Sequence, residues 1–274
     1  MNAYCRSLLL LAGLCAAPLE SVLAQDAGAG QRIAQQGGKG AAPCISCHGA
    51  QGEGNAQAGF PRIAGLPARY FAHQMKSFTD GSRNSQVMTP IAKAFDDKDI
   101  DAMASYYASL QAPATPGPKP DAAQTKRALQ LNTTGDEAKR VQACANCHGP
   151  QGAGEPPIMP PLAGQHASYL GAQLKAWRDG SRKNDASMQM PAIAKQLSEQ
   201  DVAGLSAWYA SLPAPPAAAT RALGPARAAP APAPSAGPQQ PTAPGTGTEQ
   251  GSGQTGGSQG PGGSAETPGA PQRR

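Results

Sequence analysis

Several kinds of residue are scarce in this sequence, and each scarcity excludes a class of protein. Aromatic residues make up 4% of the 274 residues, and none follows Pro213. Charged residues make up 15%, and the net charge of +5 is spread along the chain, so no basic patch for a nucleic acid or a membrane surface is predicted. The apolar run near the N-terminus, from Leu8 to Ala17, is too short to cross a bilayer.

The N-terminus has the features of a secretory signal. Arg6 precedes the apolar run, and a small-residue exit, Val22-Leu23-Ala24, follows it. We therefore predict that residues 1–24 are a signal peptide and that the mature protein resides in the periplasm, with no transmembrane segment. Four of the six cysteines remain in the mature chain. In an exported protein they would ordinarily form disulfides, unless a cofactor consumes them.

Composition also divides the chain. Residues 214–274 are dominated by Pro, Ala, Gly, Ser, Gln and Thr, which cannot bury enough apolar surface to offset chain entropy, so we predict a disordered tail. A segment with four prolines, residues 112–120, predicts a linker. We therefore expect two domains of about 90 residues each, 25–116 and 117–213. Each would be marginally stable on side-chain burial alone, so a covalently held apolar cofactor would complete its core.

The cysteines of the mature chain lie in two copies of one motif, C-x-x-C-H. Its residues are Cys44, Cys47 and His48 in the first copy and Cys144, Cys147 and His148 in the second. On a helical turn, positions i, i+3 and i+4 project from one side, so two thiols can bond the vinyl groups of a haem while the imidazole reaches the iron. C-x-x-C-H is the attachment signature of a c-type haem. We predict two covalently bound haems c, with the two histidines as iron ligands.

Two other uses of paired cysteines fit the sequence less well. A four-coordinate zinc site needs two further Cys or His residues at finger-like spacing, and neither motif has them nearby. A thioredoxin-like dithiol needs a βαβ context, and no strand-like run flanks the cysteines. Repetition of the whole motif, using every cysteine of the mature chain, favours haem.

An internal duplication surrounds the two motifs. Equivalent stretches recur at offsets of 99 to 102 residues, among them His48 to Gly54 with His148 to Gly154, and Asp80-Gly-Ser-Arg83 with Asp179-Gly-Ser-Arg182. Apolar residues at helical spacing predict that each repeat is all-α. The expected helices cover residues 30–36, 66–78 and 96–110 in the first repeat and 122–131, 165–177 and 198–212 in the second. The last helix of each repeat begins with a capping pattern.

With these features the chain resembles the dihaem cytochromes c of the cytochrome c4 type over about residues 28–213. The carrying stretches are both C-x-x-C-H motifs, Pro-x-[Ile/Leu]-Ala-Gly at 61–65 and 160–164, Met-x-x-Ile-Ala-Lys at 88–93 and 190–195, and the Tyr-Ala-Ser-Leu helix ends. The resemblance implies an all-α tandem pair of class I cytochrome c domains, each wrapped around a covalent haem. The low-complexity tail departs from the compact family pattern.

Each iron needs a second axial ligand. Methionine is the available soft donor, because the two remaining histidines, His73 and His166, do not align between the repeats. Met88 and Met190 each precede an Ile-Ala-Lys stretch by three residues, and the resemblance places the axial methionine there. Met188 is the closest competitor, but it has no counterpart in the first repeat.

The resemblance implies one further interaction at each site. In class I domains the carbonyl of the proline that corresponds to Pro61 and Pro160 accepts a hydrogen bond from Nδ1 of the proximal histidine. Such a bond would fix the tautomer of the ring and leave its other nitrogen for the iron.

We expect an electron carrier and not an enzyme. A His/Met haem suits electron transfer, and the resemblance implies a quinol-oxidising complex or a dehydrogenase as donor and a terminal oxidase as acceptor. Two alternatives stay open. The chain could be the cytochrome subunit of a larger periplasmic dehydrogenase, which would purify as a stable complex. It could also be a dihaem peroxidase, which needs an accessible iron face and acid–base groups beside it.

Overall fold

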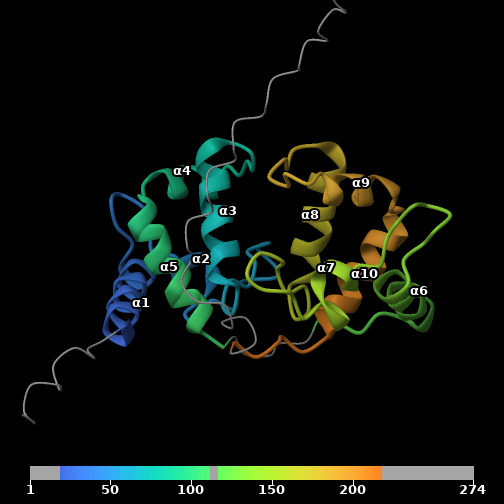
Figure 1. Ribbon diagram of the computed structural model, residues 1–274, viewed down its shortest axis with the longest axis horizontal. Coiled ribbons are helices and arrows are strands. Elements are labelled where there is room, and N and C mark those ends of the chain that lie inside the picture. Colours follow the sequence, from blue (N-terminus) through green and yellow to red (C-terminus); the bar gives the residue numbers. More distant parts are fainter. Residues whose placement is uncertain (1–18, 112–116, 218–274) are drawn as a thin grey trace, which may run out of the picture. The chain divides into compact units, whose positions relative to one another are not determined.

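The computed structural model describes residues 19–111 and 117–217. In this part of the chain there are helices and isolated bridge pairs but no β-strand. The first repeat contains α1 (Leu19–Gln36), α2 (Ile45–His48), α3 (Ala68–Asp80), α4 (Met88–Lys93) and α5 (Asp97–Ser109). The second contains α6 (Ala122–Thr133), α7 (Ala145–His148), the 3-10 helix η1 (Pro150–Gly152), α8 (Ala167–Asp179), α9 (Gln189–Gln196) and α10 (Glu199–Ser211). The all-α prediction is confirmed, and Figure 1 shows the two sets of helices in succession along the chain.

Three sequence predictions lie partly outside the described residues. The predicted signal peptide is described only from Leu19 on, where α1 begins and continues through the predicted cleavage point to Gln36. Residues 112–116 of the linker are not among the described residues, and of the predicted disordered tail only residues 214–217 are. Within the described ranges, no helix is both long and apolar enough to cross a membrane.

The helix starts follow the cap chemistry of the sequence. Helices α5 and α10 begin with the predicted capping boxes, whose first residues are Asp96 and Ser198. A third box, formed by Asp121 with Gln124, begins α6 and was not among the predictions. In each box the side chains accept hydrogen bonds from backbone amides that have no partner within the first helical turn. Residues adjacent in the sequence therefore determine where these three helices begin.

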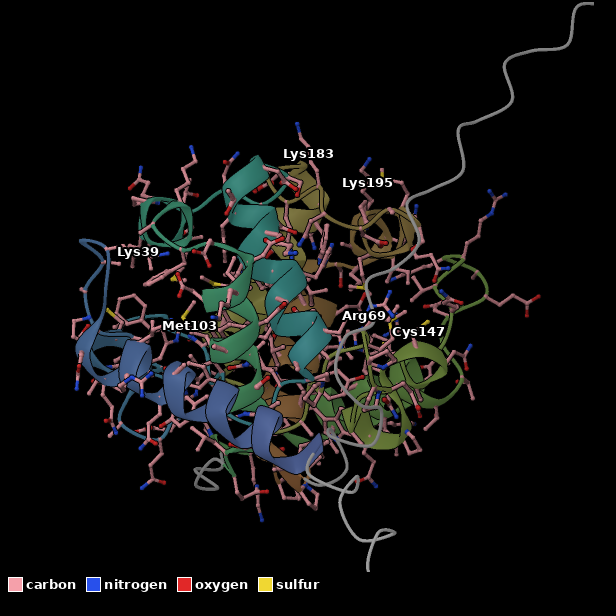
Figure 2. The ribbon with its side chains drawn as sticks, turned by 60° about the vertical axis from the view of Figure 1, so that its left-hand side comes forward. Lys39, Arg69, Met103, Cys147, Lys183 and Lys195 are labelled. Atoms are coloured by element: carbon pink, nitrogen blue, oxygen red, sulfur yellow. The ribbon has the colours of Figure 1, made fainter. Side chains whose placement is uncertain are left out.

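The core of the first repeat lies around the closing helix α5, which contacts α1 and α3. Met103 and Tyr107 of its apolar stripe are almost fully buried (Met103 is labelled in Figure 2). The Tyr107 ring stacks on Phe71 of α3 with 5.5 Å between ring centroids. Helix α1 crosses α5 very closely, because a Cβ at Gly30 would lie 2.1 Å from the backbone oxygen of Ala102. The close packing of α1 on α5 therefore requires a glycine at position 30.

The second repeat has the same arrangement with the glycine on the other helix. Helix α10 contacts α6 and α8, and its residues Leu205 and Tyr209 are buried. Gly204 of α10 faces Gln124 of α6, whose Cβ would lie 3.7 Å from a Cβ added to the glycine. The opening helix of this repeat needs no glycine of its own, because the small residue sits on its partner.

A hydrogen-bond network centred on Arg62 joins the two repeats. Arg62 is 3% exposed, and its guanidinium donates to three backbone carbonyls. The acceptors are Ala64 in its own repeat, at 2.8 Å, and Ala163 and Gly164 in the second, at 3.1 and 3.2 Å. Gln165 completes the network, since its side chain accepts from the backbone nitrogen of Arg62 and donates to its carbonyl, both at 2.9 Å. Burial lowers the pKa of Arg62 to about 10, so the side chain remains a cation at neutral pH.

The segments that follow the two closing helices also cross between the repeats. The backbone nitrogen of Gly117, in the predicted linker, donates to the carbonyl of Ala210 in α10 at 2.9 Å. The backbone nitrogen of Ala217 donates to Oε1 of Gln111 at 2.7 Å. Residues 214–217, the first of the predicted tail, therefore return to the first repeat.

Candidate functional site

Each C-x-x-C-H motif forms one helical turn, as its spacing predicts. Helices α2 and α7 carry the motifs, and the amides of His48 and His148 each donate to the carbonyl of the first motif cysteine at 2.9 Å. All the cysteines of the described residues are free and half-buried, and they are Cys44, Cys47, Cys144 and Cys147. Two thiols and one imidazole therefore leave the same turn, as haem attachment requires.

Both motif histidines are oriented by a proline carbonyl. Nδ1 of His48 lies 2.9 Å from the carbonyl oxygen of Pro61, and Nδ1 of His148 lies 3.0 Å from that of Pro160. A carbonyl oxygen can only accept a hydrogen bond, so Nδ1 carries the proton in both rings and Nε2 keeps its lone pair. Both rings are buried, and burial lowers the pKa of each imidazole. A neutral, oriented imidazole with Nε2 available is what a haem iron needs, so the residues fit the predicted cofactor.

The loop after each motif brings this proline close to the histidine. Gly54 has a φ of +81°, its amide donates to the carbonyl of His48 at 2.7 Å, and a Cβ there would lie 2.5 Å from the carbonyl carbon of Pro61. Gly154 has a φ of +88°, and its added Cβ would lie 2.8 Å from the nitrogen of Pro161. Any other residue would be strained and would push the proline segment away. The last glycine of the recurring His-Gly-x-Gln-Gly-x-Gly stretch is therefore part of the histidine's support.

The two aligned methionines stand at corresponding places. Met88 is the first residue of α4, Met190 is the second residue of α9, and both side chains are half-buried. Met188 is the residue before α9. Unlike Met190, its side chain is 58% exposed, and its φ is +56°. An iron ligand must face the interior of its domain, so burial favours Met190 over Met188.

Two residues that the sequence predictions did not include support these methionines. The backbone nitrogen of Met88 donates to Oγ of Ser85 at 3.1 Å, and that of Met190 donates to Oδ2 of Asp185 at 2.7 Å. Burial alone would raise the pKa of Asp185, but hydrogen bonds from Ser187 and from the Met190 amide outweigh it and lower the pKa. A Ser or Asp shortly before a helix is a capping signal, and it could have identified both residues.

The other two histidines, His73 and His166, do not occupy corresponding positions in the two repeats. His73 is an exposed residue of α3, with Nδ1 3.0 Å from the side-chain nitrogen of Gln74. Nε2 of His166 lies 3.0 Å from the carbonyl oxygen of Glu53, so that nitrogen must donate. Neither histidine matches the other in position or partner, which agrees with the expectation that they are not a repeated ligand pair.

A tyrosine of the closing helix lies beside the first cysteine of each motif. Burial, followed by the charge of the neighbouring cysteine, raises the pKa of Tyr107 beside Cys44 and of Tyr209 beside Cys144. The hydroxyl of Tyr209 donates to Oδ1 of Asn132 at 2.9 Å. The hydroxyl of Tyr107 is buried without a hydrogen bond of normal geometry to any described residue. The two sites therefore differ in whether the hydroxyl of the equivalent tyrosine has a hydrogen-bond partner among the described residues.

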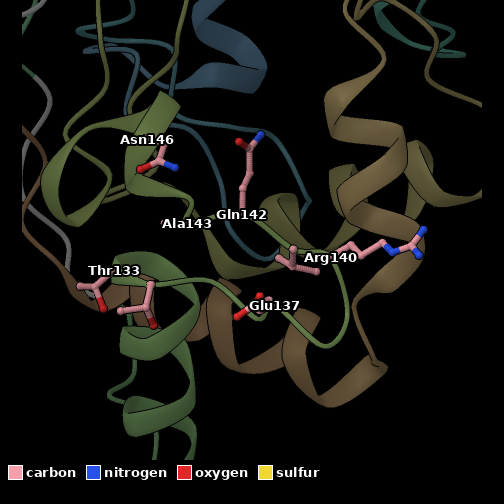
Figure 3. Close-up of a pocket in the computed structure, with 8 residues that line it drawn as sticks. Thr133, Glu137, Arg140, Gln142, Ala143 and Asn146 are labelled. Carbon is pink, nitrogen blue, oxygen red and sulfur yellow. The ribbon is translucent and has the colours of Figure 1, made fainter.

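The surface beside the second motif is hollowed. A depression of about 580 Å³ is lined by the end of α6, by the loop that follows it and by Asn146 of the motif (Figure 3). This loop, residues 134–143, is longer than the corresponding loop of the first repeat, residues 37–43. The longer loop gives the second motif a polar rim that the first motif lacks.

A comparison with protein families identifies the domain type. The family model described as Cytochrome c matches the chain twice, at residues 29–111 and 135–213. Each match contains one C-x-x-C-H motif, its proline and its aligned methionine. The two matches together cover more than half of the chain.

Relatives extend the likeness to the tandem pair. The chain is 42% identical to the thiosulfate dehydrogenase electron acceptor of Thiomonas intermedia, over 64% of this chain and 81% of that protein. It is 36% identical to cytochrome c4 of Pseudomonas aeruginosa, over 77% of this chain and 100% of that protein. Among solved structures, thiosulfate dehydrogenase (TsdBA) from Marichromatium purpuratum is similar with a TM-score of 0.64 and 38% identity. That match covers 68% of this chain and 40% of the TsdBA chain.

Proposed function

Because the chain belongs to the cytochrome c family as a dihaem cytochrome of the c4 type, we propose that it is a periplasmic electron carrier whose donor is a thiosulfate-oxidising dehydrogenase. The chain carries two covalently bound haems c and transfers electrons. When bound, each haem supplies a one-electron iron couple. The observation that best supports the assignment of residues is the duplicated His–Pro hydrogen bond, at 2.9 and 3.0 Å.

We assign the attachment and ligand roles to equivalent residues of the two repeats. Cys44 and Cys47, and likewise Cys144 and Cys147, form the thioethers. His48 and His148 would ligate iron through Nε2, because the proline carbonyls hold the proton on Nδ1. Met88 and Met190 would hold each iron from its other side, and a thioether ligand there would raise the potential and close the iron to small molecules.

A pair of neighbouring substitutions tests the ligand assignment in the second repeat. Met190→Ala should remove one thioether-to-iron charge-transfer band from the red end of the ferric spectrum and let carbon monoxide bind one ferrous haem. Met188→Ala, two residues away on an exposed side chain, is the matched control and should leave the spectrum unchanged. The opposite pattern would show that Met188 is the ligand.

The proposed donor follows from the relatives. The 42% identity to a thiosulfate dehydrogenase electron acceptor supports a carrier that such a dehydrogenase reduces, with a terminal oxidase as the onward acceptor. The likeness to part of the TsdBA chain favours one alternative, in which this cytochrome is a subunit of the dehydrogenase. The two differ in whether the cytochrome dissociates between turnovers.

Stopped-flow absorbance tests the donor. A purified thiosulfate dehydrogenase with thiosulfate should reduce both haems of this protein rapidly, whereas thiosulfate alone should not reduce them. Catalytic thiosulfate oxidation by the purified chain alone would instead show that it is an enzyme. Size-exclusion chromatography of the mixture separates the remaining two cases, since a free carrier elutes apart from the dehydrogenase and a subunit elutes with it.

A further inference from the structure

The equivalent tyrosines of the two closing helices differ in what holds their hydroxyl groups. Tyr107 of α5 and Tyr209 of α10 are both buried. The hydroxyl of Tyr209 donates to Oδ1 of Asn132 at 2.9 Å, so its proton has a fixed direction. The hydroxyl of Tyr107 has no hydrogen bond of normal geometry to a described residue. One hydroxyl is therefore oriented and the other is free to turn.

One residue of the opening helix accounts for this difference. Asn132 of α6 and Ala34 of α1 occupy the same position, because each lies three residues before a glycine of positive φ that follows its helix. These glycines are Gly135 and Gly37. Asn132 is 2% exposed and Ala34 is fully buried. Because the alanine side chain has no polar atom, the first repeat offers Tyr107 no acceptor at this position.

The end of α6 is also fixed against the second motif. The backbone nitrogen of Cys144 donates to the carbonyl of Leu131, the residue before Asn132, at 3.2 Å. Asn132 therefore approaches the motif from its own helix while Tyr209 reaches it from α10. The amide, the hydroxyl and the cysteine are held together by two helices and one backbone hydrogen bond.

The sulfur of the first motif cysteine is within hydrogen-bonding reach of each hydroxyl. Burial raises the pKa of Cys144, and a hydrogen bond with Tyr209 offsets part of this effect. Burial and Tyr107 act on Cys44 in the same two ways. A tyrosine hydroxyl has one proton, and an amide oxygen is a better acceptor than sulfur. Tyr209 therefore presents its oxygen to Cys144, whereas Tyr107 can turn its proton toward Cys44.

A buried hydroxyl dipole influences a nearby iron couple through its direction, because the surrounding protein screens it weakly. An oxygen directed toward the haem attachment stabilises the more positive ferric state and lowers the reduction potential, and a proton directed there raises it. We propose that Asn132 is a positioning residue that lowers the reduction potential of the second haem, by holding the proton of Tyr209 away from Cys144. This orientation favours the electron on the first haem.

The inference rests on the haem attachments at Cys44 and Cys144 that the proposed function assigns, and not on the identity of the donor. The outcome of the donor experiment therefore has no bearing on it. Measuring the haem content of every variant distinguishes a failed attachment from a failed orientation effect.

Spectroelectrochemical titration of the holoprotein tests the proposal. Asn132→Ala gives the second repeat the residue of the first, frees the Tyr209 proton and should raise one of the two midpoint potentials. Tyr209→Phe removes the dipole and should raise the same midpoint by a smaller amount. Tyr107→Phe removes a proton that can face Cys44 and should lower the other midpoint. Thr133→Ala, at the exposed neighbour of Asn132 (Figure 3), is the matched control and should change neither.

A double substitution separates the direction of the hydroxyl from packing. In the Tyr209→Phe background, Asn132→Ala should cause no further rise, because no hydroxyl remains to be turned. A further rise equal to that of Asn132→Ala alone would show that Asn132 acts through packing and would overturn the proposal. An unchanged or lowered midpoint in Asn132→Ala would overturn it as well.

Two further variants keep the test decisive if Asn132→Ala loses the second haem. Asn132→Leu fills the space without supplying an acceptor, and it should raise the same midpoint. The two tyrosine variants leave both opening helices intact, and their midpoints should shift in opposite directions. Shifts of the same sign in Tyr107→Phe and Tyr209→Phe would contradict the proposed orientations.

Discussion

The first and second repeats place the same groups around their haem sites, yet they secure them differently. Both proximal histidines meet a proline carbonyl at nearly the same distance, 2.9 and 3.0 Å. Arg62 anchors the first repeat to carbonyls of the second, whereas the residue after the second proline, Pro161, has no donor to offer in return. The contact that orients the histidine is therefore the same in both repeats, whereas the packing behind the proline differs between them.

The largest expected contrast concerns haem attachment in one repeat. Cys144→Ala should leave one haem per chain, and the second repeat should fail to fold because the haem makes up most of its core. Haem content by the pyridine haemochrome method and helicity by circular dichroism measure the two effects. Asn146→Ala, an exposed residue of the same turn, should retain both haems. Two covalent haems in the Cys144 variant would contradict the assignment.

The next contrast lies in the ion pairs at the closing helices. Asp201 is 4% exposed and is paired with Arg127 at 2.7 Å and Lys139 at 2.9 Å. Asp201→Asn should cost roughly 2 kcal/mol, less than a fully buried pair because both cations reach water. The counterpart pair of Asp99 with Lys39 is more exposed, so Asp99→Asn should change the denaturation midpoint little. Equal losses in the two variants would remove this distinction between the repeats.

The same aspartate predicts a pH dependence. Burial alone would raise the pKa of Asp201, but hydrogen bonds from Arg127, Lys139 and Ser198 outweigh it and hold the pKa well below the usual range. A carboxyl whose folded pKa is depressed contributes stability above its unfolded pKa of about 3.9 and loses it as the pH falls toward the folded value. The stability difference between the unsubstituted protein and Asp201→Asn should therefore be constant from pH 5 to 8 and shrink below pH 4.

Glycine substitutions at the two helix crossings should have opposite signs. Gly30→Ala should destabilise the first repeat by about 2 kcal/mol, because its Cβ would meet a backbone oxygen that cannot move aside. Gly204→Ala should stabilise the second repeat by about 0.5 to 1 kcal/mol, since the site has room and alanine favours the helix. Thermal unfolding of the two variants measures both, and a loss of stability in each would contradict the geometry.

The smallest contrast is between two tyrosine hydroxyls. Tyr209→Phe should cost about 1 kcal/mol, because it leaves the buried Asn132 side chain without this partner. Tyr107→Phe should be neutral or slightly stabilising, since the hydroxyl it removes has no hydrogen bond of normal geometry among the described residues. Denaturant titrations resolve the difference, and a larger loss at Tyr107 would show that its hydroxyl has a partner in the haem-loaded protein.

The sequence predicted most of the fold, and the site residues that it proposes lie at corresponding places in the two repeats. C-x-x-C-H, the capping boxes and the helical stripes are local patterns, in which a few neighbouring residues decide the geometry. Ser85 and Asp185 were missed although a local capping signal was present. Arg83 and Arg182 were visible as a repeated stretch, but nothing in that stretch indicates that the two residues meet.

The sequence by itself determined the two haem attachments, the all-α class and the duplication, because covalent chemistry and helical periodicity depend on residues adjacent in the chain. Only the tertiary structure shows that Met190 is half-buried while Met188 is 58% exposed, and on which helix each crossing places its glycine. It also brought Arg83 and Arg182 together at the boundary between the repeats. These features depend on distances across the fold, which spacing along one chain does not specify.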